Sequence, residues 1–198
     1  MSSNYQILIQ KLDAFIRKYY KNRLLKGGIY SLALLLGLFI LLTTIEYFAQ
    51  FNTTGRTIIF YSFFALAGYI LVQYIFIPIS KLYKFGKVIN HQQAAEIIGR
   101  HFTDVKDKLT NVLQLQEMAI NQENQLVIAG IDQKSVELKP VPFTDAVNLK
   151  ENVKHLKYAA IPLFLMLIIS IFSPNIFQVS TNRLINHNTE IKPTAPFQ

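Results

Sequence analysis

The sequence predicts an all-α integral membrane protein with three transmembrane helices, an N-terminal amphipathic helix and a small helical cytoplasmic insert. Three runs without a charged residue support this prediction, at residues 57–80, 27–45 and 158–182. A hydrocarbon core about 30 Å thick needs roughly 20 apolar residues in a helix, and lipid offers no partner to an exposed peptide group. The composition agrees, because 51% of the residues are hydrophobic and the mean hydropathy is +0.26.

The basic residues predict an orientation for these spans. Residues 1–26 carry six basic side chains against one acidic side chain, and lysines follow the second span and precede the third. The turn between the first two spans has only Arg56 with Glu46, and the tail has only Arg183 and Lys192 with Glu190. By the positive-inside rule, the N-terminus and the middle region are cytoplasmic and the C-terminus is exported. This asymmetry accounts for the net charge of +8, so no nucleic-acid partner is expected.

Residues 1–26 form the predicted amphipathic helix. Its apolar side chains recur every three or four residues, while its cations lie mainly elsewhere around the helix. Such a helix can lie in the lipid headgroup layer, which we favour, or dock on a protein partner. The apolar face consists of Tyr5, Leu8, Leu12, Phe15, Ile16 and Tyr19. The residues expected to contact lipid or a partner are Arg17, Lys18, Lys21, Arg23 and Lys26.

Residues 27–80 form a predicted transmembrane hairpin, with spans at about 27–45 and 57–78. In the first span, Ala33 and Gly37 make a pair of small residues four positions apart, which lets another helix approach closely. Gln73 is the strongly polar side chain well inside the second span, and an amide in lipid prefers a hydrogen bond across a helix interface. We therefore predict that these three residues take part in helix packing.

Residues 81–157 form the predicted cytoplasmic helical region. Asn90 is suited to cap a helix, and a helical hairpin should turn near Phe102. After two prolines, a last helix should begin near Asp145 or Asn148 and continue into the third span, at 158–177. Residues 178–198 show no second apolar face, so we expect an exported linker or tail. The chain is then expected to be the front end of a longer protein, or its tail to be held by a partner.

No residue pattern predicts catalysis, a cofactor or a metal ion. The sequence has no cysteine, and no two of its four histidines stand four residues apart. The phosphate loop, the dinucleotide-binding glycine motif and the nucleophile elbow are all missing from it. We therefore expect a non-enzymatic protein without a cofactor or an evident small-molecule substrate.

Three segments together resemble a known family. They are LIQKLDAFIRKYYKNRLLKG at 8–27, INHQQAAEIIGRHFTDVKDKLTNVLQL at 89–115 and IDQKSVELKPVPFTDAVNL at 131–149. They are similar to the N-terminal portion of large inner-membrane proteins of the Bacteroidetes group, a family described as a domain of unknown function and sometimes labelled ATPase. The resemblance implies a three-span front end before a long exported region, and a bacterial inner (cytoplasmic) membrane location with a periplasmic C-terminus. It transfers architecture and no functional residues.

Three functions are compatible with these features. The first is a membrane anchor and scaffold module, bound to the lipid bilayer and to protein partners in a membrane complex. The second is an accessory subunit of a secretion machine or membrane enzyme. The third is a small transporter or channel, which is disfavoured because no span has a charge at its centre.

Overall fold

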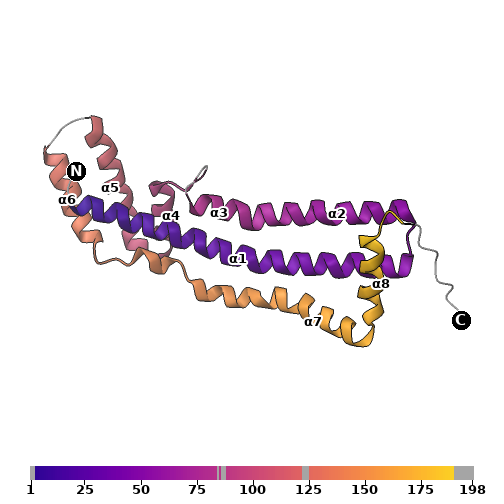
Figure 1. The fold of residues 1–198 in the computed structure, drawn as a ribbon. Coiled ribbons are helices and arrows are strands. Elements are labelled where there is room, and N and C mark those ends of the chain that lie inside the picture. The colour runs from indigo at the N-terminus through magenta and orange to yellow at the C-terminus, as the bar shows by residue number, and fades with distance from the viewer. Residues whose placement is uncertain (1–2, 84, 86–87, 122–124, 190–198) are drawn as a thin grey trace, which may run out of the picture. The chain divides into compact units, whose positions relative to one another are not determined.

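The computed structural model describes residues 3–83, 85, 88–121 and 125–189, and every regular element in these ranges is helical (Figure 1). Eight of the elements are α-helices, while η1 is π-helical and η2 and η3 are 3-10 helices. In chain order they are α1 (Ser3–Ala49), α2 (Thr53–Leu71), η1 (Val72–Phe76), α3 (Ile77–Leu82), α4 (His91–His101), α5 (Thr103–Asn121), α6 (Gln125–Leu138), η2 (Phe143–Ala146), η3 (Leu149–His155), α7 (Leu156–Phe172) and α8 (Pro174–Ile185).

The chain forms two compact units. Residues 1–23 and 79–150 make one, which we call the core unit, and residues 24–78 and 151–198 make the other, which we call the span unit. The predicted amphipathic helix and the predicted cytoplasmic region, treated as separate segments from sequence, thus belong to one unit. The single helix α1 contributes its first part to the core unit and the rest to the span unit.

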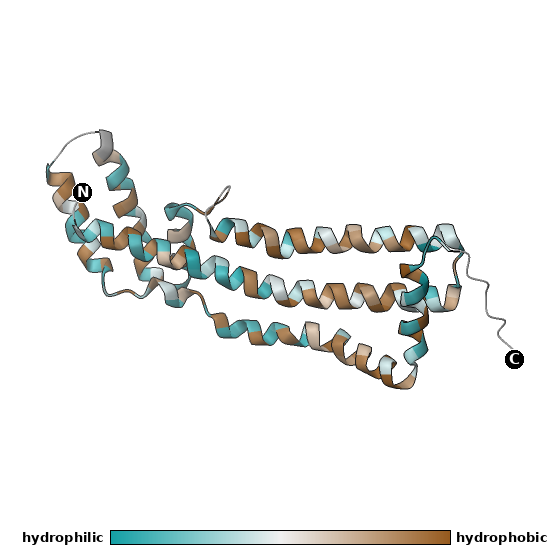
Figure 2. Cartoon of the chain, in the orientation of Figure 1, coloured by the Kyte–Doolittle hydropathy of each residue, from teal (hydrophilic) through white to brown (hydrophobic). Residues whose placement is uncertain are grey.

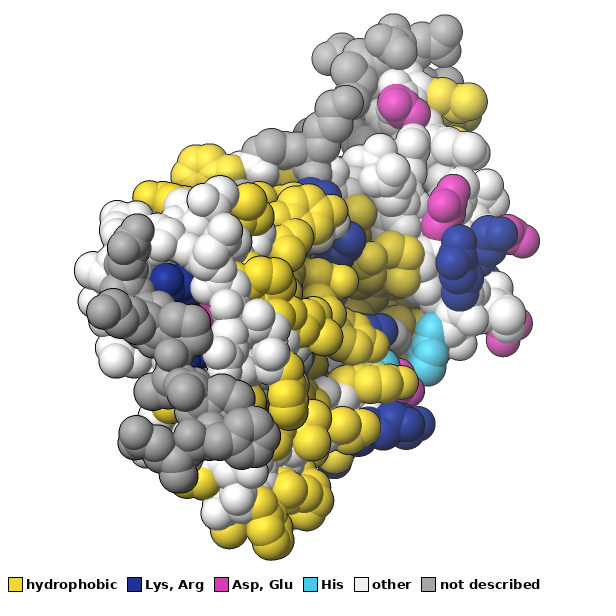
Figure 3. Space-filling model, turned by 90° about the vertical axis from the view of Figure 1, so that its right-hand side faces the viewer, with side chains coloured by type: hydrophobic (Ala, Val, Ile, Leu, Met, Phe, Trp, Pro, Cys, Tyr) yellow, Lys and Arg dark blue, Asp and Glu magenta, His cyan; other side chains and the backbone are white. Residues whose placement is uncertain are grey.

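Three helical stretches are long and apolar enough to cross a membrane, namely Ser3–Ala49, Thr53–Leu82 and Phe143–Phe172. In Figure 2 most of α2, α7 and the later part of α1 is coloured as hydrophobic, and Figure 3 shows many hydrophobic side chains on the face that it draws. Side chains such as Ile58, Phe64 and Phe164 are more than half exposed. The predicted all-α class with three membrane-length helices is therefore confirmed.

The core unit is built around the apolar face of the first part of α1. Leu12 and Phe15 are fully buried there, with Ile98 of α4 and Leu109 of α5. The face predicted to lie in lipid is therefore covered by the chain's own helices, which corrects that prediction. The physical reason is that α4, α5 and α6 each carry an apolar stripe, and α1 supplies the surface that closes their common core.

Local signals in the core unit act as the sequence predicts. Asn90 caps α4, since its side chain accepts a hydrogen bond from the Gln93 N–H while the Gln93 side chain accepts one from the Asn90 N–H. The helical hairpin turns at Phe102, between α4 and α5. The expected last helix differs, because η2 and η3 precede α7, whose first residue is Leu156.

The segment after α7 differs from the linker predicted for residues 178–198. α7 ends at Phe172, and α8 then begins at Pro174, which occupies the first helical turn, where a missing N–H breaks no helical hydrogen bond. Within the span unit, α8 packs against α2 and against Phe39 of α1, whose ring stacks on Phe177 at 5.7 Å between centroids. The first part of the predicted tail is therefore a helix folded back on the spans. Residues 190–198 lie outside the described residues.

Candidate functional site

The span unit buries three charged side chains near the turn between α1 and α2. Glu46 of α1 is completely buried, Arg56 of α2 is 3% exposed and Arg183 of α8 is 9% exposed. Charged side chains are almost never buried to this extent unless they are paired. These three residues, which we call the charge layer, are therefore the least ordinary feature of the described structure.

The chain folds locally so that three helix ends meet there. Gln50 adopts a left-handed conformation at the end of α1, with φ of 47°, and Asn52 then caps α2 by accepting a hydrogen bond from the Gly55 N–H. This tight turn places Arg56 in the first turns of α2. Arg183 comes from the last turn of α8.

The turn after α8 closes over the beginning of α2. A guanidinium nitrogen of Arg56 donates to the Thr189 carbonyl at 3.2 Å, and Nδ1 of His187 lies 3.2 Å from the Thr57 hydroxyl. The His187 ring also packs against Phe60, with 4.6 Å between centroids. These contacts attach α8 and its following turn to the first turns of α2.

The electrostatics of the charge layer are incompletely balanced. Both arginines attract the Glu46 carboxylate, yet two positive groups face one negative group. Nε and Nη1 of Arg56 and the Ser180 hydroxyl are buried and have no hydrogen-bond partner among the described residues. A buried polar group without a partner costs about 1–3 kcal/mol, so this arrangement has unused binding capacity.

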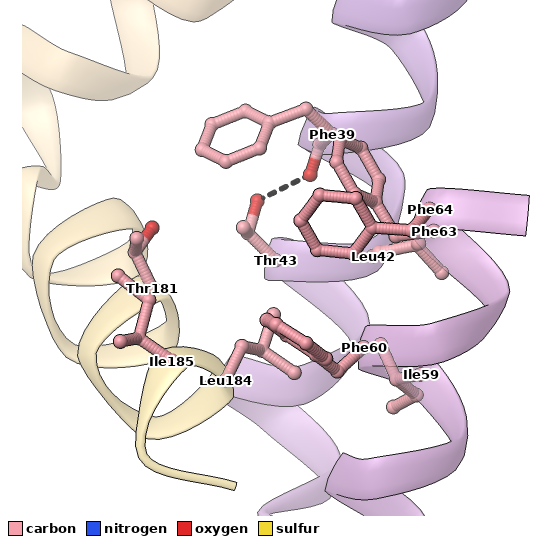
Figure 4. Close-up of a pocket in the computed structure, with 10 residues that line it drawn as sticks. All are labelled: Phe39, Leu42, Thr43, Ile59, Phe60, Phe63, Phe64, Thr181, Leu184 and Ile185. Carbon is pink, nitrogen blue, oxygen red and sulfur yellow. Dashed lines mark hydrogen bonds between the residues drawn. The ribbon is translucent and has the colours of Figure 1, made fainter. Parts of the chain in front are cut away.

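An apolar cavity of about 140 Å³ lies between α1, α2 and α8 (Figure 4). One of its two polar side chains is Thr43, whose hydroxyl donates to the Phe39 carbonyl at 2.7 Å. Its lining residues are Phe39, Leu42, Thr43, Ile59, Phe60, Phe63, Phe64, Thr181, Leu184 and Ile185. A cavity with this lining can bind a hydrocarbon group but has few hydrogen-bonding groups for a polar ligand.

The five predicted contact residues of the first helix lie in different surroundings. Arg17, Lys21 and Arg23 are exposed. Lys18 donates to the Thr144 carbonyl at 2.9 Å, within the core unit, and the ammonium of Lys26 lies 5.8 Å from the Tyr30 ring centroid, within the span unit. Contact of these cations with lipid or a partner stays a prediction.

The residues predicted to pack helices are half-buried or exposed. Ala33 and Gly37 line an open groove of about 470 Å³ together with Tyr30, Tyr74 and Tyr158. Apart from the nearby backbone of its own helix and its two chain neighbours, no described atom lies within 4 Å of the place where a Cβ on Gly37 would be. Gln73 is exposed. Inside the span unit a close approach of two helices falls at Gly27, and helix packing by Ala33, Gly37 and Gln73 stays a prediction.

No sequence pattern predicts the charge layer, because Glu46, Arg56 and Arg183 each stand where a flanking charge sets the topology of a span. One signal could have revealed α8. Ile176, Phe177, Ser180 and Leu184 recur with helical spacing after Pro174, which is a good first residue for a helix. With that helix recognised, Arg183 would fall on its buried face.

The histidines of the described part have separate neighbours. His91 lies 3.1 Å from an Asp13 carboxylate oxygen, and His155 lies 3.0 Å from the Tyr30 hydroxyl. Within the described ranges, no group of three or more His, Asp or Glu side chains is placed to hold a metal ion.

Comparisons of the chain with protein-family models, with curated proteins and with solved structures gave no match. The resemblance to the Bacteroidetes inner-membrane family therefore stays a prediction from the sequence.

Proposed function

We propose that this chain is a membrane-anchoring and scaffolding module of a bacterial inner membrane. Its three membrane-length helices insert in the bilayer, and its core unit stays on the cytoplasmic side and binds protein partners. One observation carries the proposal: apolar side chains are exposed along the span unit, whereas the core unit closes a hydrophobic core of its own. Exposed apolar surface of this extent is typical of contact with lipid or with other membrane helices.

The cations of the first helix support the proposed orientation. Arg17, Lys21 and Arg23 are exposed at the end of the core unit's part of α1, just before the apolar run begins. Cationic side chains at that position favour the cytoplasmic, anionic leaflet of the membrane.

A second function, accessory subunit of a larger membrane complex, is favoured by Gln73. Its amide is exposed within an apolar helical stretch, where lipid provides no hydrogen bond. A neighbouring membrane helix would supply that partner, and the open groove beside Gly37 would admit such a helix. The mass of the natural product separates the two functions. About 22.7 kDa favours the subunit, and a several-fold larger mass favours an anchor at the front of a longer protein.

Site-specific crosslinking tests the scaffold role. The chain contains no cysteine, so Glu96→Cys introduces a single thiol on the exposed surface of α4. We expect a thiol-reactive crosslinker to join this variant to another protein in native membranes. Ser135→Cys is the control, because Ser135 is 2% exposed and a thiol there should not react. A failure of several exposed positions of the core unit to form any protein adduct would contradict the partner role.

A further inference from the structure

The charge layer and the apolar cavity lie next to each other on all three helices that form them. Glu46 follows the cavity residue Thr43 by three positions on α1, and Arg56 precedes Ile59 by three on α2. On α8, Arg183 lies directly before the cavity residue Leu184 in the sequence. Residues three or four apart share one face of a helix, about one turn from each other. The charge layer therefore lies one helical turn from the cavity on α1 and on α2, and next to a cavity residue in sequence on α8.

The polar layer is suited to an anion. Two arginines and one glutamate leave a formal charge of +1 in a buried place, where an unbalanced charge is costly. Nε and Nη1 of Arg56 have no acceptor among the described residues. In a guanidinium group, Nε and Nη2 point to the same side and match two oxygens of one phosphate group. A single monoanionic phosphodiester on Nε and Nη2 of Arg56 would balance the charge and supply the acceptor that Nε lacks.

The cavity is suited to a hydrocarbon chain. Its volume of about 140 Å³ is close to that of an engineered apolar cavity of roughly 150 Å³ that admits benzene. It can thus hold part of an acyl chain but not a whole one. Figure 4 shows the aromatic side chains of α1 and α2 facing Thr181 and Leu184 of α8 across this space.

We propose that these two features form one binding site for a phospholipid, with its phosphodiester on Arg56 and Arg183 and part of an acyl chain in the cavity. This site rests on the proposed insertion of the helices in a bilayer. The α1–α2 turn would then lie at the membrane–water interface, the depth at which headgroups are found. The phosphate takes the place of the Thr189 carbonyl on Arg56, so binding opens the turn that follows α8.

Lipid retention by the full chain tests this site. The protein is purified in a mild detergent from membranes containing phosphatidylglycerol and phosphatidylethanolamine, and bound phospholipid is counted by native mass spectrometry. We expect about one phospholipid per wild-type chain, and about tenfold lower retention in Arg183→Gln, which is a loss of about 1.4 kcal/mol of binding. Arg100→Gln, at an exposed arginine of α4, is the matched control and should retain lipid as the wild type does.

Two more variants separate loss of binding from loss of folding. Arg183→Lys keeps the charge and should retain most of the lipid. Thr181→Leu fills the cavity without touching an arginine and should lower retention several-fold. Helical content measured by circular dichroism should match the wild type in both variants. Equal retention in Arg183→Gln and the wild type, or no lipid on the wild type, would overturn the site.

The same purified protein allows the lipid site and the proposed membrane insertion to be tested separately. Delipidated protein titrated with inorganic phosphate should gain no thermal stability, whereas phosphatidylglycerol should raise its melting temperature. Stabilisation by inorganic phosphate alone would assign a small-anion site and overturn the lipid site. A protein that stays in alkali-washed membranes but carries no phospholipid would overturn the lipid site and leave the insertion standing.

Discussion

The backbone carbonyl of Tyr74 lies so close to Gly27 that a Cβ atom at position 27 would collide with it. Pro78 stands four residues after Tyr74 and has no N–H, so it cannot donate the usual helical hydrogen bond to that carbonyl. The helix widens at the same point into the π-helical segment Val72–Phe76. A proline, a widened turn and a glycine thus combine to let α1 and the segment Val72–Phe76 approach each other closely.

The collision predicts different effects of alanine at two adjacent glycines. Gly27→Ala should lower the free energy of unfolding by about 1–3 kcal/mol, because the backbone of Tyr74 must move. At Gly28, no described atom outside its two chain neighbours and the nearby backbone of its own helix lies within 4 Å of the added carbon. Gly28→Ala should therefore be neutral or stabilise the helix by up to about 1 kcal/mol. Thermal unfolding in one detergent, followed by circular dichroism, measures both. Equal effects would contradict the close approach.

Lys11 is the basis of a second prediction. Its ammonium donates to the carbonyls of Lys139 and Val141 at 2.6 and 2.7 Å, on either side of Pro140, and burial lowers its pKa. Lys11→Met removes the donor from both carbonyls and should destabilise the core unit by about 1–3 kcal/mol. Hydrogen exchange of the α4 and α5 amides in the full chain measures this.

Lys108→Met is the matched control for Lys11→Met. Lys108 forms an exposed ion pair with Glu137 at 3.0 Å, and exposed pairs contribute about 0–1 kcal/mol. If the α4 and α5 amides exchange as fast in Lys108→Met as in Lys11→Met, the carbonyl contacts of Lys11 do not stabilise the core unit.

Glu46 should hold α8 against the spans. Glu46→Gln leaves two buried arginines without a counter-charge. Removing one partner of a buried ion pair typically lowers the free energy of unfolding by an amount on the order of 3 kcal/mol. We expect the α8 amides to exchange faster than in the wild type, while the exchange rates of the α4 amides stay the same. Glu96→Gln alters an exposed carboxylate on α4 and should leave α8 as in the wild type. Unchanged exchange of α8 in Glu46→Gln would show that the charge layer does not fasten this helix.

The membrane-length helices and the hairpin turn at Phe102 could be predicted because their signals are local. Apolar length identifies a span, and a capping residue such as Asn90 identifies a helix start. The surface that covers a helix is not a local property. The apolar face of Leu8, Leu12 and Phe15 has the same pattern whether lipid or another helix covers it, and here the core unit covers it.

The charge layer was missed for a related reason. Glu46, Arg56 and Arg183 stand at the ends of apolar runs, which is also where topology-setting charges stand. These three side chains are buried because α8 packs against α1 and α2. None of the three residues indicates that packing by itself. The cavity beside them is likewise a product of three helices that are distant in sequence.

The cap of α4 gives a prediction for the core unit. Asn90→Ala removes the acceptor for the Gln93 N–H, at 2.8 Å, and should cost about 1 kcal/mol. The first-turn amides of α4 should then exchange faster. Asn111→Ala, at an exposed position inside α5, is the matched control and should be neutral or slightly stabilising. Slower or unchanged exchange at the start of α4 would contradict a stabilising cap.

Accessibility of single cysteines tests the proposed membrane topology most directly. Thr54→Cys places a thiol at the exposed start of α2, and Glu96→Cys places one on the core unit. In sealed spheroplasts, a maleimide that cannot cross the membrane should label Thr54→Cys at once and Glu96→Cys only after permeabilisation. Labelling of Glu96→Cys in intact spheroplasts at the rate of Thr54→Cys would contradict a cytoplasmic core unit joined to membrane-crossing helices.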